Sequence, residues 1–302
     1  MPKTISSLSG YISILKGLRR SAPAGATFLF RGQGQLHAEP VPKIFRNLGH
    51  QGSENSMLLK LISQSPREFS EDSFAFDRLV RAQHFGIPTR LLDVSTNPMT
   101  ALFFAVSESS NSRGHVLIYS VKEREVKFFN SDSVSCVANL AYLTQEERHI
   151  LKITTSRVAK EIFKKLPRGW SKYKVEEPEN WENYVSEFNK EAVVKRLVQF
   201  IKEEKPYFEN KIDPLTLYRI IAVTPKLSNQ RLVAQAGGFF LFGLAENNTS
   251  SPSSTLAKSV EIAFDKKGSL LEELNAVGVN QATVYPELDK IAKGISDRAR
   301  TD

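Results

Sequence analysis

The sequence contains few of the residues that build covalent or metal-held frameworks. Its 302 residues include a single cysteine, Cys136, and five histidines. One cysteine excludes an internal disulfide and a zinc site built from several cysteines. We therefore expect a protein of the reducing cytoplasm.

Long hydrophobic runs are also lacking. No apolar stretch approaches the roughly 20 residues that a membrane-spanning helix needs. The first 20 residues are amphipathic, without the apolar centre and cleavage site of a signal peptide. Hydrophobic residues nevertheless make up 41% of the chain, which is enough for a substantial core. The sequence therefore predicts a globular protein without a membrane partner.

The positive charge is concentrated in one segment. The whole chain carries a net charge of +8, and residues 152–174 contain eight basic residues and one acid, a net charge of +7. The aromatic residues Phe163, Trp170 and Tyr173 lie between these charges. Basic and aromatic side chains together suit a single-stranded nucleic acid, through phosphate neutralisation and base stacking. The alternatives are a solvated cationic face and a docking surface for an acidic protein. The residues expected to bind nucleic acid are Arg157, Lys160, Lys164, Lys165, Arg168 and Lys172.

The richest stretch in polar residues is AQHFGIPTRLLDVSTNPMTALFFA, residues 82–105. Gly86 and Pro88 are expected to stop a helix that ends near His84. Asn97 or a neighbouring Ser or Thr can cap a second helix that accepts Pro98 in its first turn. We expect a short connector between these helices.

That connector would hold four polar side chains close together, because a rigid scaffold commonly positions site residues on loops. They are His84, Thr89, Arg90 and Asp93. The alternative is structural, with Arg90 and Asp93 forming an ion pair and His84 capping a helix.

Residues 27–33 read as a short strand that ends in Arg31 and Gly32. Glycine allows a phosphate to approach the backbone, and a guanidinium binds it bidentately. The pair therefore suits anion binding, although a simple turn explains it as well.

Hydrophobic periodicity predicts helices and strands along the rest of the chain. Helices are expected at residues 5–18, through most of 142–210, and around Leu270, Leu271 and Leu274 up to Gly278. Strands are expected at 114–121, at 217–223, after Gly237 and Gly238, and at 259–264, with residues 126–129 pairing to the first.

Four motifs occur in order: Phe30-Arg31-Gly32; AQHFGIPTRLLD followed by NPxxALFFA; RLxAQxGxF from Arg231; and LxxLxxxGVxxxTVYPELD near the end. In this order they resemble the FRG domain family of bacterial proteins. The likeness covers most of the chain, and residues 142–210 are its least familiar part.

This resemblance implies an activity. The aromatic-Arg-Gly motif is similar to the first motif of the Arg-type ADP-ribosyltransferases, in which the arginine holds the dinucleotide. Thr89 would then take the place of the second-motif hydroxyl, Arg90 would share the phosphate clamp, and His84 would orient the ribose. The residues expected to bind NAD are Phe30, Arg31, Gly32, Gln33, His84, Thr89 and Arg90.

The chemistry limits the catalytic groups. Breaking the nicotinamide glycosidic bond passes through a cation-like sugar, which needs a nearby carboxylate or amide oxygen but no metal. The chain does not show the Ser-Thr-Ser and Glu motifs of those transferases, so Asp93 is the expected acid and Gln235 the polar alternative. Arg31, Asp93 and Gln235 are the expected catalytic residues.

FRG proteins are associated with toxins of bacterial phage-defence systems, including ADP-ribosylation of RNA. The resemblance therefore implies an NAD-dependent ADP-ribosyltransferase toxin that modifies nucleic acid, with RNA as the expected acceptor and an antitoxin as a possible partner. The alternatives are a protein acceptor, and a non-catalytic module that binds RNA or a partner.

We expect an α+β fold built on a split, twisted sheet of the ADP-ribosyltransferase type, with surrounding helices and a helical insertion. The chain would be one domain over residues 1–302. Its core would come from residues 26–130 and 215–295, and residues 140–212 would form the basic insertion.

Overall fold

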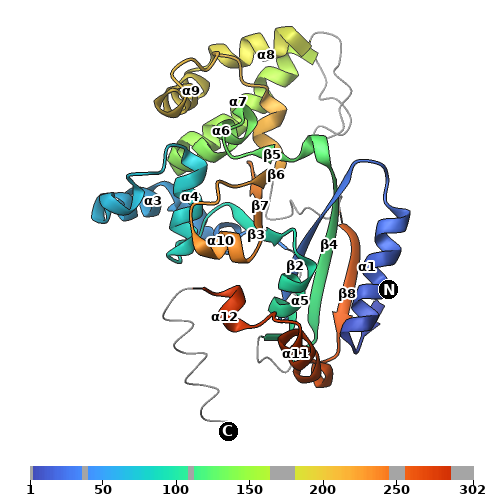
Figure 1. The fold of residues 1–302 in the computed structure, drawn as a ribbon. Coiled ribbons are helices and arrows are strands. Elements are labelled where there is room, and N and C mark those ends of the chain that lie inside the picture. Colours follow the sequence, from blue (N-terminus) through green and yellow to red (C-terminus); the bar gives the residue numbers. More distant parts are fainter. Residues whose placement is uncertain (1–2, 36–39, 108–111, 164–180, 245–255, 287–302) are drawn as a thin grey trace.

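An eight-stranded mixed sheet organises the computed structural model, which describes residues 3–35, 40–107, 112–163, 181–244 and 256–286 (Figure 1). From one edge to the other the strands are β1 (Lys3–Ile5), β8 (Leu256–Ile262), β4 (Gly114–Lys122), β2 (Ala26–Gln33), β3 (Leu91–Ser95), β7 (Gly237–Phe242), β6 (Ile220–Thr224) and β5 (Lys127–Phe128). The described α-helices are α1 (Leu8–Ser21), α2 (Leu48–Gly52), α3 (Glu54–Gln64), α4 (Ala75–His84), α5 (Pro98–Ser107), α6 (Asp132–Ala138), α7 (Gln145–Phe163), α8 (Trp181–Lys190), α9 (Ala192–Glu204), α10 (Gln230–Ala234), α11 (Lys267–Ala276) and α12 (Gln281–Val284). The fold is therefore α+β.

The sheet is divided at its centre. β2 pairs with β4 over eight residues, and β3 pairs with β7 over five. In contrast, β2 and β3 share one register pair, Phe30 with Ser95. Beyond that pair the two strands diverge, so the sheet consists of two four-stranded halves joined at one point.

Alternating side chains give the sheet two different faces, because successive residues of a strand point in opposite directions. On one face, Phe30, Val116 and Ile118 pack with α1, α5 and α11. On the other face, β4 contributes Leu117 and Tyr119 to a separate core beneath residues 41–45. Arg31 alternates with Phe30 and therefore points to the second face.

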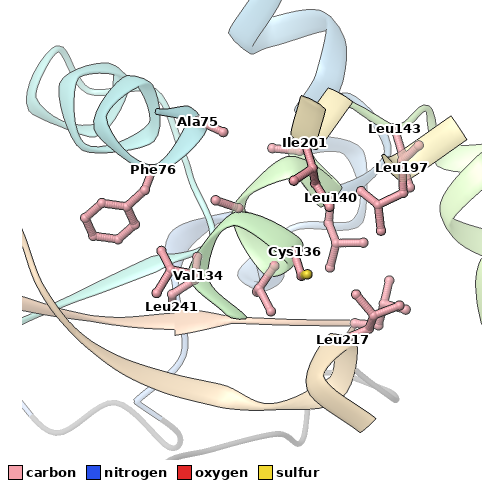
Figure 2. Packing of buried hydrophobic residues seen from close by; sticks show 14 of the residues in the cluster. Ala75, Phe76, Val134, Cys136, Leu140, Leu143, Leu197, Ile201, Leu217 and Leu241 are labelled. Carbon is pink, nitrogen blue, oxygen red and sulfur yellow. The ribbon is translucent and has the colours of Figure 1, made fainter. Parts of the chain in front are cut away.

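The largest core lies between the sheet and α4, α6 and α9 (Figure 2). Its labelled residues in Figure 2 include Phe76 of α4, Cys136 of α6 and Leu241 of β7. Burial raises the pKa of the Cys136 thiol to about 12, so this cysteine behaves as a packed apolar group. This core fixes the position of α4, which carries part of the site described below.

The helix signals of the central stretch are confirmed. Helix α4 ends at His84, and Gly86 has φ +91°, a conformation that favours glycine. Asn97 Oδ1 accepts a hydrogen bond from Met99 N at 2.9 Å and so starts α5. Helix α11 also ends as expected, shortly before Gly278, which has φ +80°.

Two expectations about strands are wrong. The connector predicted between α4 and α5 contains β3, a central strand paired to β7 and β2. Its sequence LLDVS is a short apolar run, which periodicity alone does not identify as a strand. Residues 127–128 do not pair with residues 114–121, because β5 lies at the far edge of the sheet, parallel to β6.

Candidate functional site

A pocket of about 330 Å³ lies where β2 and β3 diverge. Its walls come from the end of α4, the loop that follows, β3, the helical turn at residues 43–46, and α10. The polar residues that line it are Arg31, Lys43, Arg46, Gln83, His84, Thr89, Asp93, Asn229, Arg231 and Gln235. Both halves of the sheet therefore contribute to one polar pocket. Five of the expected site residues line it: Arg31, His84, Thr89, Asp93 and Gln235.

Arg31 connects the two halves. Its Nη1 donates a hydrogen bond to the backbone oxygen of Asp93 on β3 at 2.7 Å. Within the part of the chain that the structure describes, its buried Nε has no hydrogen-bond partner. Burial lowers the pKa of the Arg31 guanidinium, and the negative charge of Asp93 opposes this effect. The guanidinium thus retains hydrogen-bonding capacity in a partly desolvated position.

A chain of hydrogen bonds holds the Asp93 carboxylate. The buried Thr89 hydroxyl donates to Gln83 Oε1 at 2.5 Å, and Gln83 Nε2 donates to Asp93 Oδ1 at 2.8 Å. Because Thr89 donates to the oxygen of the Gln83 amide, the nitrogen of that amide faces Asp93. The exposed carboxylate is thereby held in a fixed orientation.

The remaining wall is basic. Lys43 and Arg46 lie on the turn facing Arg31, and Arg231 comes from α10. The pKa of Arg46 is lowered by burial and, to a smaller extent, by the positive charge of Arg31. Two guanidinium groups that repel each other across a pocket are stabilised by an anion placed between them.

Arg90 requires a correction, because the structure does not bring it into the pocket. It is 1% exposed and binds Glu54 through two hydrogen bonds, Nε to Oε1 at 2.8 Å and Nη2 to Oε2 at 2.5 Å. Its Nη1 donates to the backbone oxygen of Phe242 at 3.0 Å. The structural alternative, an ion pair between Arg90 and Asp93, is also wrong in its partner, since Arg90 pairs with Glu54. Arg90 therefore supports the fold and is not available to a phosphate.

Phe30 and Gly32 likewise serve packing. Phe30 is buried on the α5 side of the sheet. A Cβ on Gly32 would lie 1.8 Å from the backbone oxygen of Ala101 in α5. The glycine is required by the close approach of a helix, so the expected approach of a phosphate at this residue is wrong.

Gln235, the polar alternative to Asp93, lines the pocket from the end of α10. Its Nε2 donates to the backbone oxygen of Val284 at 3.1 Å. Its backbone oxygen accepts a hydrogen bond from Ser95 Oγ at 2.6 Å, which ties α10 to β3. The next residue, Ala236, has φ +45°, so the turn after α10 is held in a conformation uncommon for alanine.

The basic insertion is described in part. Lys160 is exposed on α7, whereas Arg157 pairs with Glu161 at 3.0 Å and Glu191 at 2.7 Å. The other expected nucleic-acid ligands, Lys164, Lys165, Arg168 and Lys172, lie outside the described residues. In Figure 1 helices α7 and α8 occupy the top of the molecule, away from α10 and β3 near its middle. The charge of Arg157 is thus already compensated, and its helix does not line the pocket.

No group of three or more His, Cys, Asp or Glu side chains among the described residues could hold a metal ion. No helix among those residues is long and apolar enough to cross a membrane.

Several pocket residues were missed at the sequence level. Gln83 lies in the central stretch but shows its role only through its contacts with Thr89 and Asp93. Lys43 and Arg46 lie three residues apart in a short helical turn. Residues at this spacing share one face of the turn, and this was the signal in the sequence that could have identified them. Arg231 belongs to the third motif and carried no separate signal.

Comparison with known proteins gave one match. The model of the FRG domain family matches residues 26–114, which contain β2, α4, β3 and α5. This match supports the resemblance read from the motifs, over about the first third of the chain. No curated protein and no solved structure matches the chain.

Proposed function

We propose that this protein is an NAD-dependent ADP-ribosyltransferase whose site is the pocket between β2 and β3. The observation that carries the proposal is the meeting of Arg31 and Asp93 at the division of the sheet. A guanidinium and an oriented carboxylate, from opposite halves, supply a phosphate ligand and a group that stabilises a cationic sugar.

The residues of the pocket fit this substrate. Arg31, Arg46 and Arg231 offer cationic hydrogen-bond donors to a pyrophosphate. Asp93 supplies the carboxylate among the described residues that line the pocket, and Gln83 fixes its direction. The charge pattern therefore suits a ligand that is anionic in its middle and becomes cationic at one sugar.

The reaction assigns a role to Asp93. The bond between ribose C1′ and the nicotinamide nitrogen breaks, and nicotinamide leaves with both electrons. An oxygen or nitrogen of the acceptor forms the new bond to C1′, and its proton passes to the Asp93 carboxylate. The carboxylate also opposes the positive charge that develops on the sugar.

An exposed aromatic ring that neighbours the lining residue His84, without lining the pocket itself, supports a nucleic acid as the acceptor. Phe85 is 53% exposed beside His84, and the two rings lie 5.4 Å apart at 80°. An exposed aromatic next to basic residues suits an unstacked base with its phosphate. RNA is the proposed acceptor, in the setting of a phage-defence toxin with an antitoxin partner. A protein acceptor is the competing outcome.

The test is transfer of label from labelled NAD to RNA, single-stranded DNA and cell protein. Asp93→Asn is expected to lower transfer by about 10²- to 10⁴-fold with NAD binding retained. Arg31→Ala is expected to abolish NAD binding. Asp265→Asn and Arg124→Ala remove exposed charges outside the pocket lining and serve as matched controls. Circular dichroism checks the folding of each variant.

The acceptor is tested separately. Phe85→Ala is expected to lower transfer to RNA while hydrolysis of NAD by water continues. Phe128→Ala removes a comparably exposed ring from β5 and is expected to change neither reaction. Label that resists nuclease and yields to protease would identify a protein acceptor. Absence of labelling together with absence of NAD binding would overturn the transferase and favour the non-catalytic binding module.

A further inference from the structure

Three polar side chains form a row on the face of the sheet that carries Arg31. Arg31 and Gln33 are two residues apart on β2, so they point to the same side. His115 of β4 is the register partner of Gln33 and shares that face. We call Arg31, Gln33 and His115 the β2 polar row.

Most of this row is deeply buried. Gln33 is 6% exposed and His115 is 5% exposed. Among the residues that the structure describes, Gln33 Oε1, Gln33 Nε2 and His115 Nδ1 have no hydrogen-bond partner. A buried amide without partners reduces stability, and an apolar side chain of the same shape would avoid that loss. The row therefore points to a polar partner that the described residues do not supply.

The charges around the row limit what that partner can be. Burial lowers the pKa of His115. The negative charge of Glu261 on β8 opposes this lowering of the pKa, and the positive charges of Arg113 and Lys267 add to it. The histidine is thus neutral at pH 7, and the Gln33 amide is neutral as well. An uncharged planar group fits here, whereas a phosphate fits the basic end of the row at Arg31.

We propose that Gln33 and His115 bind a base of the dinucleotide, through an edge that presents a hydrogen-bond donor beside an acceptor. A glutamine amide binds the N6 and N7 edge of adenine in this way, and the carboxamide of nicotinamide offers the same pair. This subsite rests on the proposed function and lies along β2 from Arg31, beyond the residues that line the pocket in this structure.

The spacing agrees with one extended ligand. Two residues of a strand span about 6.6 Å, so a group bound at Gln33 lies next to a phosphate bound at Arg31. The polar atoms are enclosed in this structure, so the base reaches them by displacing neighbouring side chains, as in a pocket formed on binding.

The experiment uses Gln33→Leu and measures two quantities of expected opposite sign. The ligand-free variant is expected to unfold at a temperature about 2 °C or more above wild type, because the unpartnered amide is gone. Its Kd for NAD is expected to rise at least tenfold. Gln33→Met is the second variant if Leu does not fold, and Gln64→Leu, at an exposed position of α3, is the matched control.

The probes separate the two ends of the ligand. Inorganic pyrophosphate, which has no base, is expected to bind Gln33→Leu and wild type equally. A weaker affinity for ADP-ribose assigns the subsite to adenine, and a weaker affinity for nicotinamide assigns it to nicotinamide. Equal weakening of pyrophosphate and NAD would overturn the subsite, because it would indicate general damage to the pocket.

The remaining outcomes are also decisive. An unchanged Kd for NAD, or a lower unfolding temperature, would overturn the subsite and leave the transferase standing, because Gln33 would then have a structural role. Failure of wild type to bind NAD would overturn both proposals together.

Discussion

Arg31 and Arg90 both place a guanidinium near the central strand β3, in different surroundings. Arg90 is saturated by the Glu54 carboxylate and the backbone oxygen of Phe242. Arg31 binds the backbone oxygen of Asp93 and lines a pocket with Arg46, a second cation that repels it. The same residue type thus stabilises the fold where its donors are satisfied. Where its donors and its charge are not, it suits an anionic ligand.

The largest effect on stability is expected at the saturated arginine. Glu54→Gln removes the charge that compensates Arg90, and it also weakens the contact with Arg148 at 3.6 Å. Breaking a buried ion pair by changing one partner costs about 3–5 kcal/mol of unfolding free energy. Urea unfolding measures the loss, with the exposed Glu68→Gln as control. A loss below about 1 kcal/mol would show that Arg90 does not depend on this pair.

A second prediction concerns the glycine beside Arg31. Gly32→Ala is expected to lower the unfolding free energy by about 3 kcal/mol, because the new methyl group meets the backbone of α5. Gly17→Ala is the contrasting control. It lies in α1 with nothing within 4 Å of its Cβ, and we expect it to stabilise by about 0.5–1 kcal/mol. If Gly32→Ala keeps wild-type stability and loses ligand binding, the glycine belongs to the site after all.

Parallel lysine substitutions test the comparison directly. Arg31→Lys is expected to cost about 1 kcal/mol of stability and to weaken NAD binding at least tenfold, since lysine loses the planar donor pair. Arg90→Lys is expected to cost about 2–3 kcal/mol, because a charged-group hydrogen bond is lost in the interior. Its folded fraction is expected to bind NAD with the wild-type Kd. Calorimetric titration beside thermal unfolding separates the two, and a reversed pattern would exchange the roles of the two arginines.

The smallest effect is expected at Asp77 on α4, which is not among the residues that line the pocket. Burial raises the pKa of Asp77 from 3.8 to about 6, so the folded protein holds a proton that the unfolded chain releases. Stability from this group is therefore complete below about pH 4 and is lost as pH rises through 6. Relative to wild type, Asp77→Asn is expected to gain about 1 kcal/mol between pH 4 and pH 7, a value reduced for partial exposure.

Unfolding curves at the two pH values check this prediction, with NAD binding measured alongside. Equal stability of Asp77→Asn and wild type at both values would contradict the raised pKa. A change in Kd for NAD would connect Asp77 to the site and weaken the distinction between structural and functional groups.

Local chemistry explains which parts of the fold were predictable. The strand that carries Arg31 and the end of α4 at Gly86 follow from neighbouring residues. So does the start of α5 at Asn97. β3 was missed, because five residues of apolar character fit a buried helix end as well as a central strand. The pairing of β5 with β6 could not be predicted from the sequence either, because the two strands are about 95 residues apart and several helices lie between them along the chain.

The sequence indicated which residues meet at the candidate site better than it indicated what each of them contacts. Arg31, Thr89 and Asp93, which the motifs pointed to, line one pocket. The motifs also assigned Arg90 to the NAD site. This error arose because the sequence does not show that Glu54, 36 residues earlier, pairs with Arg90 in the interior. Gln83 gained its role only when α4 turned it between Thr89 and Asp93.

The helix ends near His84, Asn97 and Gly278 and the residue types at the division of the sheet could be read from the sequence, because they depend on near neighbours and on hydrophobic pattern. Tertiary structure alone decided which of two arginines lies in a pocket. It also decided that α5 packs directly against the backbone of Gly32, and that Gln33 and His115 are buried side by side. Those properties depend on distant segments brought together, and the free energy of a buried polar group is set by whatever partner that packing supplies.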